Sequence, residues 1–479
     1  MTAALKEYDL IVLGGGPAGI VGAGTAAIRG KSIAVIDSGE ELGGAGIITG
    51  TVPSKTLRET ALTLSGARSR DLYGVDLSLR REATIADLMR HQQHVQASFS
   101  GWVERQLKNS GADIFSGTAE FVDSHTVRVR MNRQPRGGRY HEGETVDFRG
   151  THILIATGSS PARPPNVDFD SGVIVDSDSV LHLRRLPKSM AVIGAGTIGC
   201  EYACVFAELH THVHVIDGRS HALTFLDAEI SDILMRVMKQ NGIVFHWGER
   251  VTSYEPQGSD GVKLTLSSGA TLRVETALVA AGRKSNTEGL KAELAGIKLG
   301  ERGLITVDQH YRTEVPHIYA AGDVIGAPAL ASTGIEQARR AMRHAFSGGP
   351  QTAIPSLLPT GVYTIPEIGM VGKTEDELIR EGTRYVAGRA CAAESARGRI
   401  IGEKDGMLKL LFDRADMKLL GAHAIGEQAT ELVHIGLIAM LAGATAEIFD
   451  EACFNIPTLG HLYKTATLDA IRSRVAEPD

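Results

Sequence analysis

Two glycine-rich turns carry the residue types and the spacing that can hold a dinucleotide. The apolar run "DLIVL" leads into the first turn, and "SMAVI" leads into the second. In each turn the first glycine permits a tight bend and the second lets the backbone approach a pyrophosphate. The third lets a helix pack closely on the strand, with its N-terminus toward the phosphates. These glycines are Gly14, Gly16 and Gly19 in the first turn and Gly194, Gly196 and Gly199 in the second.

An acidic residue ends the strand that follows each turn. "SIAVID" ends at Asp37 and "HVHVID" ends at Asp217, in both cases 23 positions after the first glycine. A carboxylate at about this spacing binds the hydroxyl groups of an adenosine ribose. Because both units are complete, chance glycine turns in an α/β protein are the weaker interpretation. The sequence predicts two dinucleotide sites.

The residues after the second acid bear on the choice of coenzyme. Asp217 can accept hydrogen bonds from the 2′-hydroxyl of NAD(H) and would repel a 2′-phosphate. Arg219, two residues on, could bind that phosphate in NADP(H). Together they predict a site for both coenzymes, while a solvated loop arginine is the alternative interpretation of Arg219.

The elements around these turns indicate the fold class. Each turn lies between an apolar strand and a helix, and the returning segments "THILIATGSSP" and "ALVAAGRKSN" follow later. We predict an α/β chain with two Rossmann-like dinucleotide-binding domains and a C-terminal α+β domain. The first dinucleotide domain comprises residues 1–157 and 283–350, the second comprises 158–282, and the C-terminal domain comprises 351–479.

Composition limits the function classes. Of the 479 residues, 43% are apolar, which is enough for a large core, and the net charge of -6 argues against binding nucleic acid. We expect a cytoplasmic protein, because no apolar run approaches the length of a membrane span and the N-terminus does not resemble a signal peptide. We expect no metal site, because the cysteines lack metal-ligand spacing. They are Cys200, Cys204, Cys391 and Cys453, the first two expected as packing residues in a helix.

Further motifs resemble the pyridine nucleotide–disulfide oxidoreductase family across essentially the whole chain. They are the loop "GGAGIITGTVPSK" at 43–55, "IATGS" at 155–159 and "HIYAAGD" at 317–323, in the family's order with the two glycine turns. The resemblance implies FAD in the first domain, NAD(P)H in the second and a homodimer formed through 351–479.

The resemblance also implies roles for individual residues. Asp323 would bind the FAD ribitol, and Lys55 would lie beside the flavin N5 atom and pair with Glu201. A fixed cation near a reduced flavin stabilises its negative charge, and a buried lysine needs an acidic partner. The alternative is that Lys55 is a surface lysine at the start of a helix. The other residues expected to bind cofactor are Gly44, Thr51, Gly158, Gly282 and Gly322.

The chain departs from the family where disulfide chemistry is carried out. Disulfide-reducing members use two cysteines in the first loop and a His–Glu pair from the partner subunit. Here the cysteine positions hold Gly46 and Thr51, and the pair is replaced by Ile456 and His461. Without a thiol, exchange with a disulfide cannot take place at this loop.

The fragments "GTVPSK" and "FNIPT" resemble one group of the family, the soluble pyridine nucleotide transhydrogenases, although that group usually keeps the first cysteine. We therefore expect FAD-dependent hydride exchange between NADPH and NAD+ without redox-active cysteines. The alternatives are an NAD(P)H:quinone or other acceptor reductase and a non-catalytic, nucleotide-sensing flavoprotein. Nicotinamide nucleotides are the expected partners, without nucleic acid or membrane.

Overall fold

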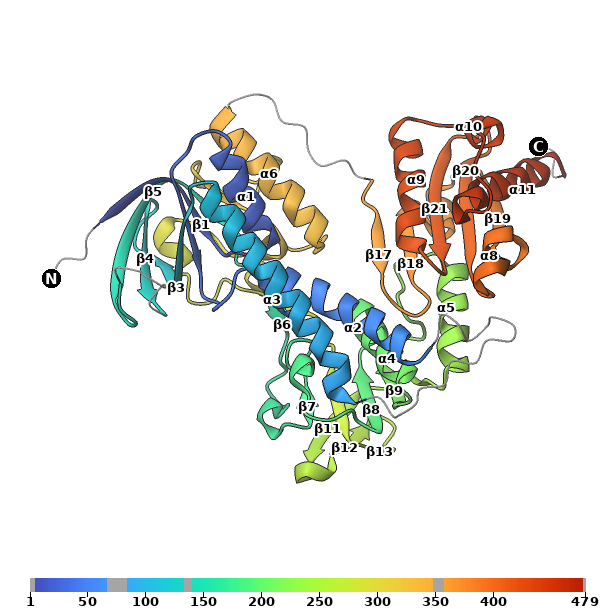
Figure 1. The fold of residues 1–479 in the computed structure, drawn as a ribbon, viewed down its shortest axis with the longest axis horizontal. Helices are drawn as coiled ribbons and strands as arrows, with labels where there is room; N and C mark the ends of the chain where they lie inside the picture. Colours follow the sequence, from blue (N-terminus) through green and yellow to red (C-terminus); the bar gives the residue numbers. More distant parts are fainter. Residues whose placement is uncertain (1–4, 67–83, 133–139, 348–356, 477–479) are drawn as a thin grey trace. The chain divides into compact units, whose positions relative to one another are not determined.

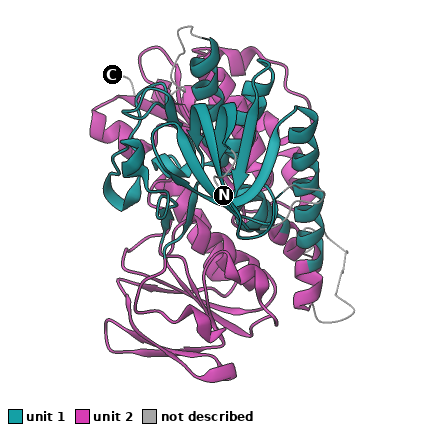
Figure 2. Ribbon diagram, turned by 90° about the vertical axis from the view of Figure 1, so that its left-hand side faces the viewer, with its two compact units in different colours: residues 1–56, 90–162, 282–355 teal, residues 57–89, 163–281, 356–479 magenta. Residues whose placement is uncertain are grey.

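A computed structural model describes residues 5–66, 84–132, 140–347 and 357–476. It divides into two compact units (Figure 2). The first unit comprises residues 1–56, 90–162 and 282–355, and the second comprises 57–89, 163–281 and 356–479. The second unit therefore combines residues predicted for the second dinucleotide domain with those predicted for the C-terminal domain.

The first unit is built on a parallel sheet in the order β3–β2–β1–β5–β16. Strand β4 pairs antiparallel with both β3 and β5, so these three strands continue as a meander. A short antiparallel pair, β6 with β15, accompanies the sheet. The strands are β1 (Lys6–Leu13), β2 (Ile33–Asp37), β3 (Asp113–Phe121), β4 (Thr126–Met131), β5 (Thr145–Ile155), β6 (Ser159–Pro161), β15 (Arg283–Ser285) and β16 (Ile318–Ala320).

Helices α1 (Pro17–Ala27) and α6 (Ala331–Ser347) lie side by side in the first unit (Figure 1). Gly22 in α1 lies close to Ala338 and Met342 in α6, since a Cβ atom at Gly22 would be 3.7 Å from either side chain. The central strand β1 is fully buried from Leu10 to Val12. A continuous apolar strand is typical of a parallel sheet that is covered on both faces.

The second unit contains a second parallel sheet, in the order β10–β9–β8–β14–β7. Helix α4 (Thr197–Glu208) packs on β8 and β9, and an antiparallel sheet of β11, β12 and β13 accompanies them. The strands are β7 (Ile174–Val175), β8 (Ser189–Ile193), β9 (His212–Asp217), β10 (Val244–Trp247), β11 (Val251–Pro256), β12 (Val262–Leu266), β13 (Thr271–Val274) and β14 (Thr276–Val279).

The C-terminal part of the second unit is an antiparallel sheet in the order β17–β18–β21–β20–β19. Helix α9 packs on β18 and β21, and α11 packs on β19 and β20. The strands are β17 (Thr360–Val362), β18 (Ile368–Gly372), β19 (Tyr385–Cys391), β20 (Met407–Asp413) and β21 (Leu419–Ile425). The remaining helices of the second unit are α5 (Ala228–Gln240), which precedes this sheet in the chain, and α7 (Glu375–Glu381), α8 (Ala396–Ile401), α9 (Ala429–Leu441), α10 (Ala446–Glu451) and α11 (Leu462–Ala476).

Two helices contribute residues to both units, namely α2 (Thr51–Leu64) and α3 (Ile85–Asn109). Of the helices that the structure describes, none has the length and apolar character needed to cross a membrane. The predicted fold class is confirmed, because two parallel sheets each carry a glycine turn and an antiparallel α+β region follows.

Candidate functional site

The first glycine turn joins β1 to α1 and is closed by backbone contacts that no larger residue would permit. Gly14 has φ +105°, and a Cβ atom there would lie 2.3 Å from the carbonyl oxygen of Ala156. A Cβ atom at Gly19 would lie 1.8 Å from the Gly14 carbonyl oxygen. Helix α1 therefore begins directly against the strand, with its first N–H groups available to an anion.

Asp37, at the end of β2, spans this turn. Its carboxylate accepts hydrogen bonds from the backbone N–H groups of Gly15 and, at 2.7 Å, Gly39. The acid and the glycine turn are therefore joined in one local structure. Asp37 is only partly buried, so it can also reach a ribose hydroxyl.

The second glycine turn repeats this geometry in the second unit. Gly194 has φ +109° and lies against Ala280, and a Cβ atom at Gly199 would lie 1.9 Å from the Gly194 carbonyl oxygen. The N–H of Ala195 donates to Asp217 Oδ2 at 2.7 Å, as Gly15 does to Asp37. Gly196 then caps α4. The predicted sequence repeat is thus also a repeat of backbone geometry.

Arg219 is ion-paired with Asp217. Arg219 Nε donates to Asp217 Oδ1 at 2.9 Å and Nη2 donates to Oδ2 at 2.7 Å. Burial raises the pKa of Asp217, but hydrogen bonds from Arg219 and Ala195 outweigh that effect and lower the pKa to about 2. The Arg219 side chain remains 48% exposed. The carboxylate is therefore charged and the guanidinium remains accessible.

A third group of predicted residues meets in the first unit, beside the β6–β15 pair. Asp323 Oδ2 accepts a hydrogen bond from Ser159 Oγ at 2.6 Å, and Arg283 Nε donates to the same hydroxyl at 2.7 Å. Gly158, Gly282 and Gly322, which flank these residues, have positive φ angles of +70°, +97° and +80°. Sequence reasoning missed Ser159 and Arg283, although each directly follows a predicted glycine.

Two buried hydroxyl groups in this unit lack hydrogen-bond partners among the described residues. They belong to Thr157, next to Gly158, and Thr333, near the start of α6. Gly334 lies close to Gly322, because a Cβ atom placed at Gly334 would be only 3.1 Å from the Cα atom of Gly322. Unsatisfied buried hydroxyls beside a tight glycine cradle fit a dinucleotide such as FAD, which would supply hydrogen-bonding groups there.

The loop at 43–55 is packed tightly around its glycines. It forms a π-helical turn at Ala45–Thr49 before α2 begins at Thr51. A Cβ atom at Gly46 would lie 2.3 Å from Pro17 Cγ, and one at Gly44 would lie 3.0 Å from Gly16 Cα. The position of the family's first cysteine therefore has no room for a side chain unless Pro17 moves.

Lys55 lies in the first unit and Glu201 lies in the second. Lys55 is partly buried on α2, and its Nζ donates to Ser54 Oγ at 3.3 Å. Glu201 is 5% exposed on α4 and accepts a hydrogen bond from the backbone N–H of Tyr363 at 2.9 Å. Their predicted pairing beside a flavin, and the cofactor role of Thr51, stay predictions.

The four cysteines are free thiols. Cys200 and Cys204 are buried in α4, which confirms the predicted packing role. Burial raises the pKa of Cys200 well above its ordinary value and that of Cys204 to about 12, so neither forms a reactive thiolate near neutral pH. Cys391 and Cys453 are exposed.

Ile456 and His461 lie on one cavity of the C-terminal part, with a volume of about 180 Å³. Ile456 is 61% exposed, and the neighbouring walls include Cys391, Arg397 and Leu462. The two residues that replace the His–Glu pair therefore border the same space. Their side chains offer an apolar surface and one imidazole.

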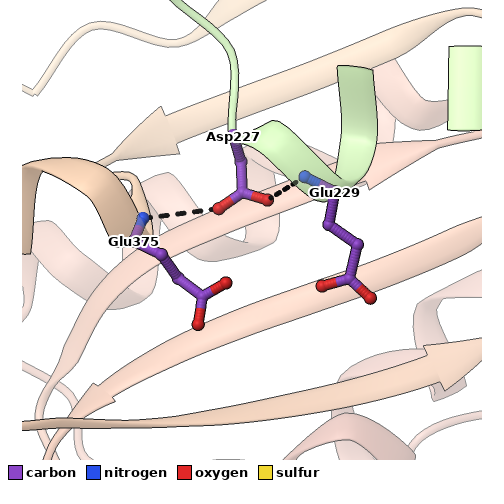
Figure 3. Close-up of side chains that lie close together, drawn as sticks. All are labelled: Asp227, Glu229 and Glu375. Atoms are coloured by element: carbon purple, nitrogen blue, oxygen red, sulfur yellow. Dashed lines mark hydrogen bonds between the residues drawn. The ribbon is translucent and has the colours of Figure 1, made fainter. Parts of the chain in front are cut away.

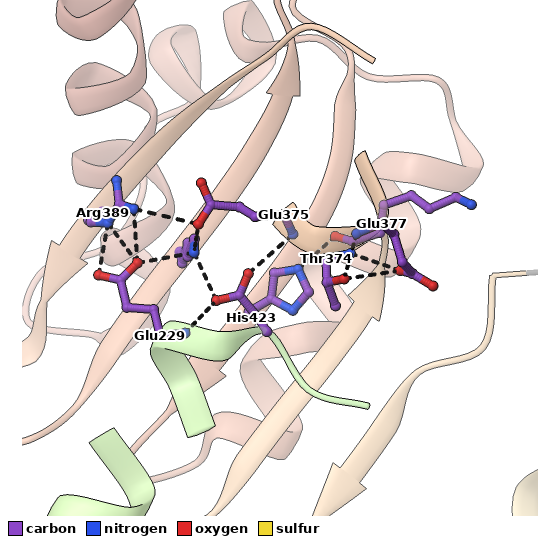
Figure 4. Close-up of polar contacts among 9 residues, drawn as sticks. Glu229, Thr374, Glu375, Glu377, Arg389 and His423 are labelled. Atoms are coloured by element: carbon purple, nitrogen blue, oxygen red, sulfur yellow. Dashed lines mark hydrogen bonds and ion pairs between the residues drawn. The ribbon is translucent and has the colours of Figure 1, made fainter. Parts of the chain in front are cut away.

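Three carboxylates gather in the second unit, at Asp227, Glu229 and Glu375 (Figure 3). Sequence reasoning missed this cluster, because Asp227 and Glu229 lie at the start of α5 and Glu375 lies at the start of α7, far away in the sequence. Lys409 Nζ lies 2.8 Å from Asp227 and 3.0 Å from Glu229, and it also pairs with Glu375. Arg389 adds a second cation beside Glu229 (Figure 4). The fully buried lysine ammonium thus lies where a metal ion would otherwise be bound by these carboxylates.

Comparison with known proteins agrees with this geometry. The family model described as pyridine nucleotide-disulphide oxidoreductase matches residues 8–345, and its dimerisation domain matches residues 358–467. The chain is 44% identical to the soluble pyridine nucleotide transhydrogenase of Mycobacterium bovis (strain BCG / Pasteur 1173P2), over 98% of both chains. It is 38% identical to the protein of that name from Pectobacterium atrosepticum, over 97% of this chain and 98% of the relative.

Solved structures show the same architecture. LpdA from Mycobacterium tuberculosis superposes with a TM-score of 0.87 at 26% identity, covering 97% of this chain and 99% of that chain. The HOCl-induced flavoprotein disulfide reductase RclA from Escherichia coli superposes with a TM-score of 0.85 at 25% identity, covering 96% and 99%. As the sequence motifs predicted, this chain belongs to the pyridine nucleotide-disulphide oxidoreductase family.

Proposed function

We propose that this protein is a flavin-dependent transhydrogenase that exchanges hydride between NADPH and NAD+. The observation that carries the proposal is the 44% identity, over 98% of both chains, to a relative named soluble pyridine nucleotide transhydrogenase. The two dinucleotide turns with their paired acids support it, because the reaction needs one bound flavin and one nicotinamide coenzyme.

The first unit would hold FAD. The start of α1 and the turn at Gly14 would receive the pyrophosphate, Asp37 the adenosine ribose and Asp323 the ribitol. The unpartnered hydroxyls of Thr157 and Thr333 would donate to the same molecule. When bound, FAD supplies a two-electron store that takes hydride from one nicotinamide and returns it to another.

The second unit would hold the nicotinamide coenzymes in turn. The start of α4 would receive the pyrophosphate, while Asp217 and Arg219 would contact the 2′ position of the adenosine ribose. Lys55, paired with Glu201, would place a fixed positive charge beside the flavin. Hydride exchange needs no proton at this step, so the absence of the His–Glu pair leaves the chemistry intact. We propose a homodimer formed through the C-terminal domain.

Steady-state kinetics with NADPH and an NAD+ analogue of distinct absorbance test the proposal. Because both coenzymes would use one pocket in turn, double-reciprocal plots should give parallel lines. A matched assay with a quinone tests the second candidate, an NAD(P)H:quinone reductase. The exposed Ile456 beside its cavity favours that candidate, because the surface could take an aromatic acceptor. If the protein reduced a quinone about a hundredfold faster than any NAD+ analogue, it would be a quinone reductase and the transhydrogenase proposal would be wrong.

A further inference from the structure

The carboxyl end of β9 carries a second arginine that is distant in sequence. A Cβ atom placed at Gly218 would lie 3.0 Å from Arg250 Nε and 3.7 Å from Arg250 Nη2. The guanidinium of Arg250 therefore lies over the bare face of Gly218. This glycine stands between Asp217 and Arg219, the two residues expected to contact the coenzyme's ribose.

The backbone fixes this contact. Strand β10 runs parallel to β9 with Trp247 opposite Asp217. Beyond the strands, the N–H of Gly248 donates to the Arg219 carbonyl at 3.2 Å, and that of Glu249 donates to the Asp217 carbonyl at 3.3 Å. The turn that carries Arg250 is thus bonded to the residues on both sides of Gly218.

The charges around this turn leave Arg250 available to a ligand. Arg250 is exposed and makes no side-chain hydrogen bond or ion pair with the residues that the structure describes. The nearby Glu249 carboxylate accepts hydrogen bonds from Ser267 Oγ at 2.6 Å and from the Ser268 N–H at 3.1 Å. Arg219, by contrast, is already neutralised by Asp217.

We propose that Arg250, together with Arg219, binds the 2′-phosphate of NADP(H). This inference rests on the proposed function and deepens it, because it names the residue that admits NADPH to a site whose acid favours NADH. Asp217 uses only two side-chain N–H groups of Arg219, so the remaining N–H groups of that guanidinium can donate to a phosphate. The unpaired charge of Arg250 would offset the repulsion between Asp217 and the phosphate.

NAD(H) has no phosphate at this position, so Arg250 should discriminate between the coenzymes. Asp217 would accept the 2′-hydroxyl of NAD(H) without help from Arg250. The absence of a side chain at Gly218 lets the guanidinium approach the ribose end of β9. Arg250 is thus a specificity-determining residue with no part in hydride transfer.

Arg250→Gln in the full-length holoprotein tests the inference through equilibrium binding of NADPH, NADH and 2′,5′-ADP. NADPH and 2′,5′-ADP should bind at least about tenfold more weakly, while the affinity for NADH should change by less than about twofold. Added salt should weaken NADPH binding less in this variant than in the wild type. Arg250→Lys should retain part of the NADPH affinity, because the charge remains.

Arg273→Gln is the matched control. Arg273 is an exposed arginine in β13, opposite Lys263, and carries no ion pair among the described residues. This variant should bind all three ligands as the wild type does. Equal weakening of NADPH and NADH in Arg250→Gln, or no change in either, would overturn the inference. Binding is read without turnover, so a wild type that binds both coenzymes but exchanges no hydride would refute the proposed function alone.

Discussion

Gly46 lies in the first unit and packs against Pro17. A Cβ atom placed at Gly46 would be only 2.3 Å from the proline Cγ atom. Gly46→Ala should therefore overpack the loop and lower the free energy of unfolding by about 1–3 kcal/mol. Denaturant unfolding of the two proteins measures this difference. FAD content should fall as well, because the loop packs against the first glycine turn at Gly16.

Gly24→Ala is the control for this substitution. Gly24 lies inside α1, and nothing comes within 4 Å of a Cβ atom placed there. Alanine should stabilise that helix by about 0.5–1 kcal/mol, because glycine loses more backbone entropy on folding. If Gly46→Ala were as stable as Gly24→Ala, the close contact with Pro17 would not constrain the loop.

His461 stands at the position where the family resemblance implies the glutamate of the His–Glu pair. Hydride exchange needs no proton from this position, so His461→Ala should change its rate by less than about twofold. Steady-state assays with NADPH and an NAD+ analogue measure the rate, with Lys55→Met as a comparison that should lose activity. A loss of more than about tenfold with the oligomeric state unchanged would assign His461 a catalytic role.

At the scale of elements, Lys409 in β20 connects two helix N-termini. Asp227 caps α5, and its carboxylate also accepts a hydrogen bond from the backbone N–H of Glu375 at the start of α7 (Figure 3). The buried ammonium lies among carboxylates from both helices. This ion cluster joins the C-terminal sheet to α5 within the second unit.

Lys409→Met should lower the free energy of unfolding by about 3–5 kcal/mol, because it leaves carboxylates buried together without their cation. Chemical denaturation measures the loss. Lys418→Met is a suitable control, because Lys418 pairs with Asp416 on the exposed surface, where ion pairs contribute little. Similar losses of unfolding free energy in the two variants would show that the buried ion cluster of Lys409 stabilises the protein no more than an exposed ion pair does.

The same cluster predicts a dependence of stability on pH. Burial by itself would raise the pKa values of Asp227 and Glu229. Hydrogen bonds outweigh that effect, from Lys409 to Asp227 and from Arg389 and Lys409 to Glu229, so that both pKa values lie below their ordinary values. A carboxylate with a lowered folded pKa contributes stability that is present above its unfolded pKa, at about 4, and lost as pH falls through the folded pKa.

Unfolding measured from pH 7 down to about pH 3 should therefore show a loss of stability at the acidic end. The loss should be smaller in Lys409→Met, because that variant no longer has the cation that lowers the carboxylate pKa values. An acid dependence unchanged by the substitution would mean that other carboxylates determine it.

At the scale of the whole molecule, the proposed mechanism predicts the redox capacity from the residues at the cysteine positions. Gly46 and Thr51 carry no sulfur, and the thiols of Cys200 and Cys204 are buried in α4. Anaerobic titration should consume about two electrons per FAD, where a flavin with a disulfide would take about four. The half-reduced protein should lack the long-wavelength absorption of a thiolate stacked on flavin.

Thiol alkylation provides the control for that titration and should leave hydride exchange unchanged. Uptake of four electrons, or inhibition by alkylation only after reduction, would reveal a dithiol and refute the proposed mechanism. The exposed Cys391 and Cys453 are the thiols that alkylation should label first.

The glycine turns, their acids and the fold class could be predicted from the sequence, because the properties that create them are local. A positive φ at Gly14 or Gly194 and a helix packed against its own strand are determined by residues within one strand–turn–helix unit. The acid at the end of the next parallel strand meets the turn because neighbouring parallel strands end at the same sheet edge. Asp37 and Asp217 therefore both reach their turns.

Other features depend on contacts between distant segments and were decided only by the tertiary structure. Lys409 meets Asp227 across 182 positions, and Arg250 reaches Gly218 through the pairing of β9 with β10. Neither contact has a local sequence signal, because strand order and side-chain direction bring the residues together. The lack of room for a side chain at Gly46 also depends on a distant contact, because the loop at 43–55 packs against Pro17 at the start of α1. Sequence thus determined which residues could bind dinucleotides, whereas packing decided which charges are paired and which remain available to a ligand.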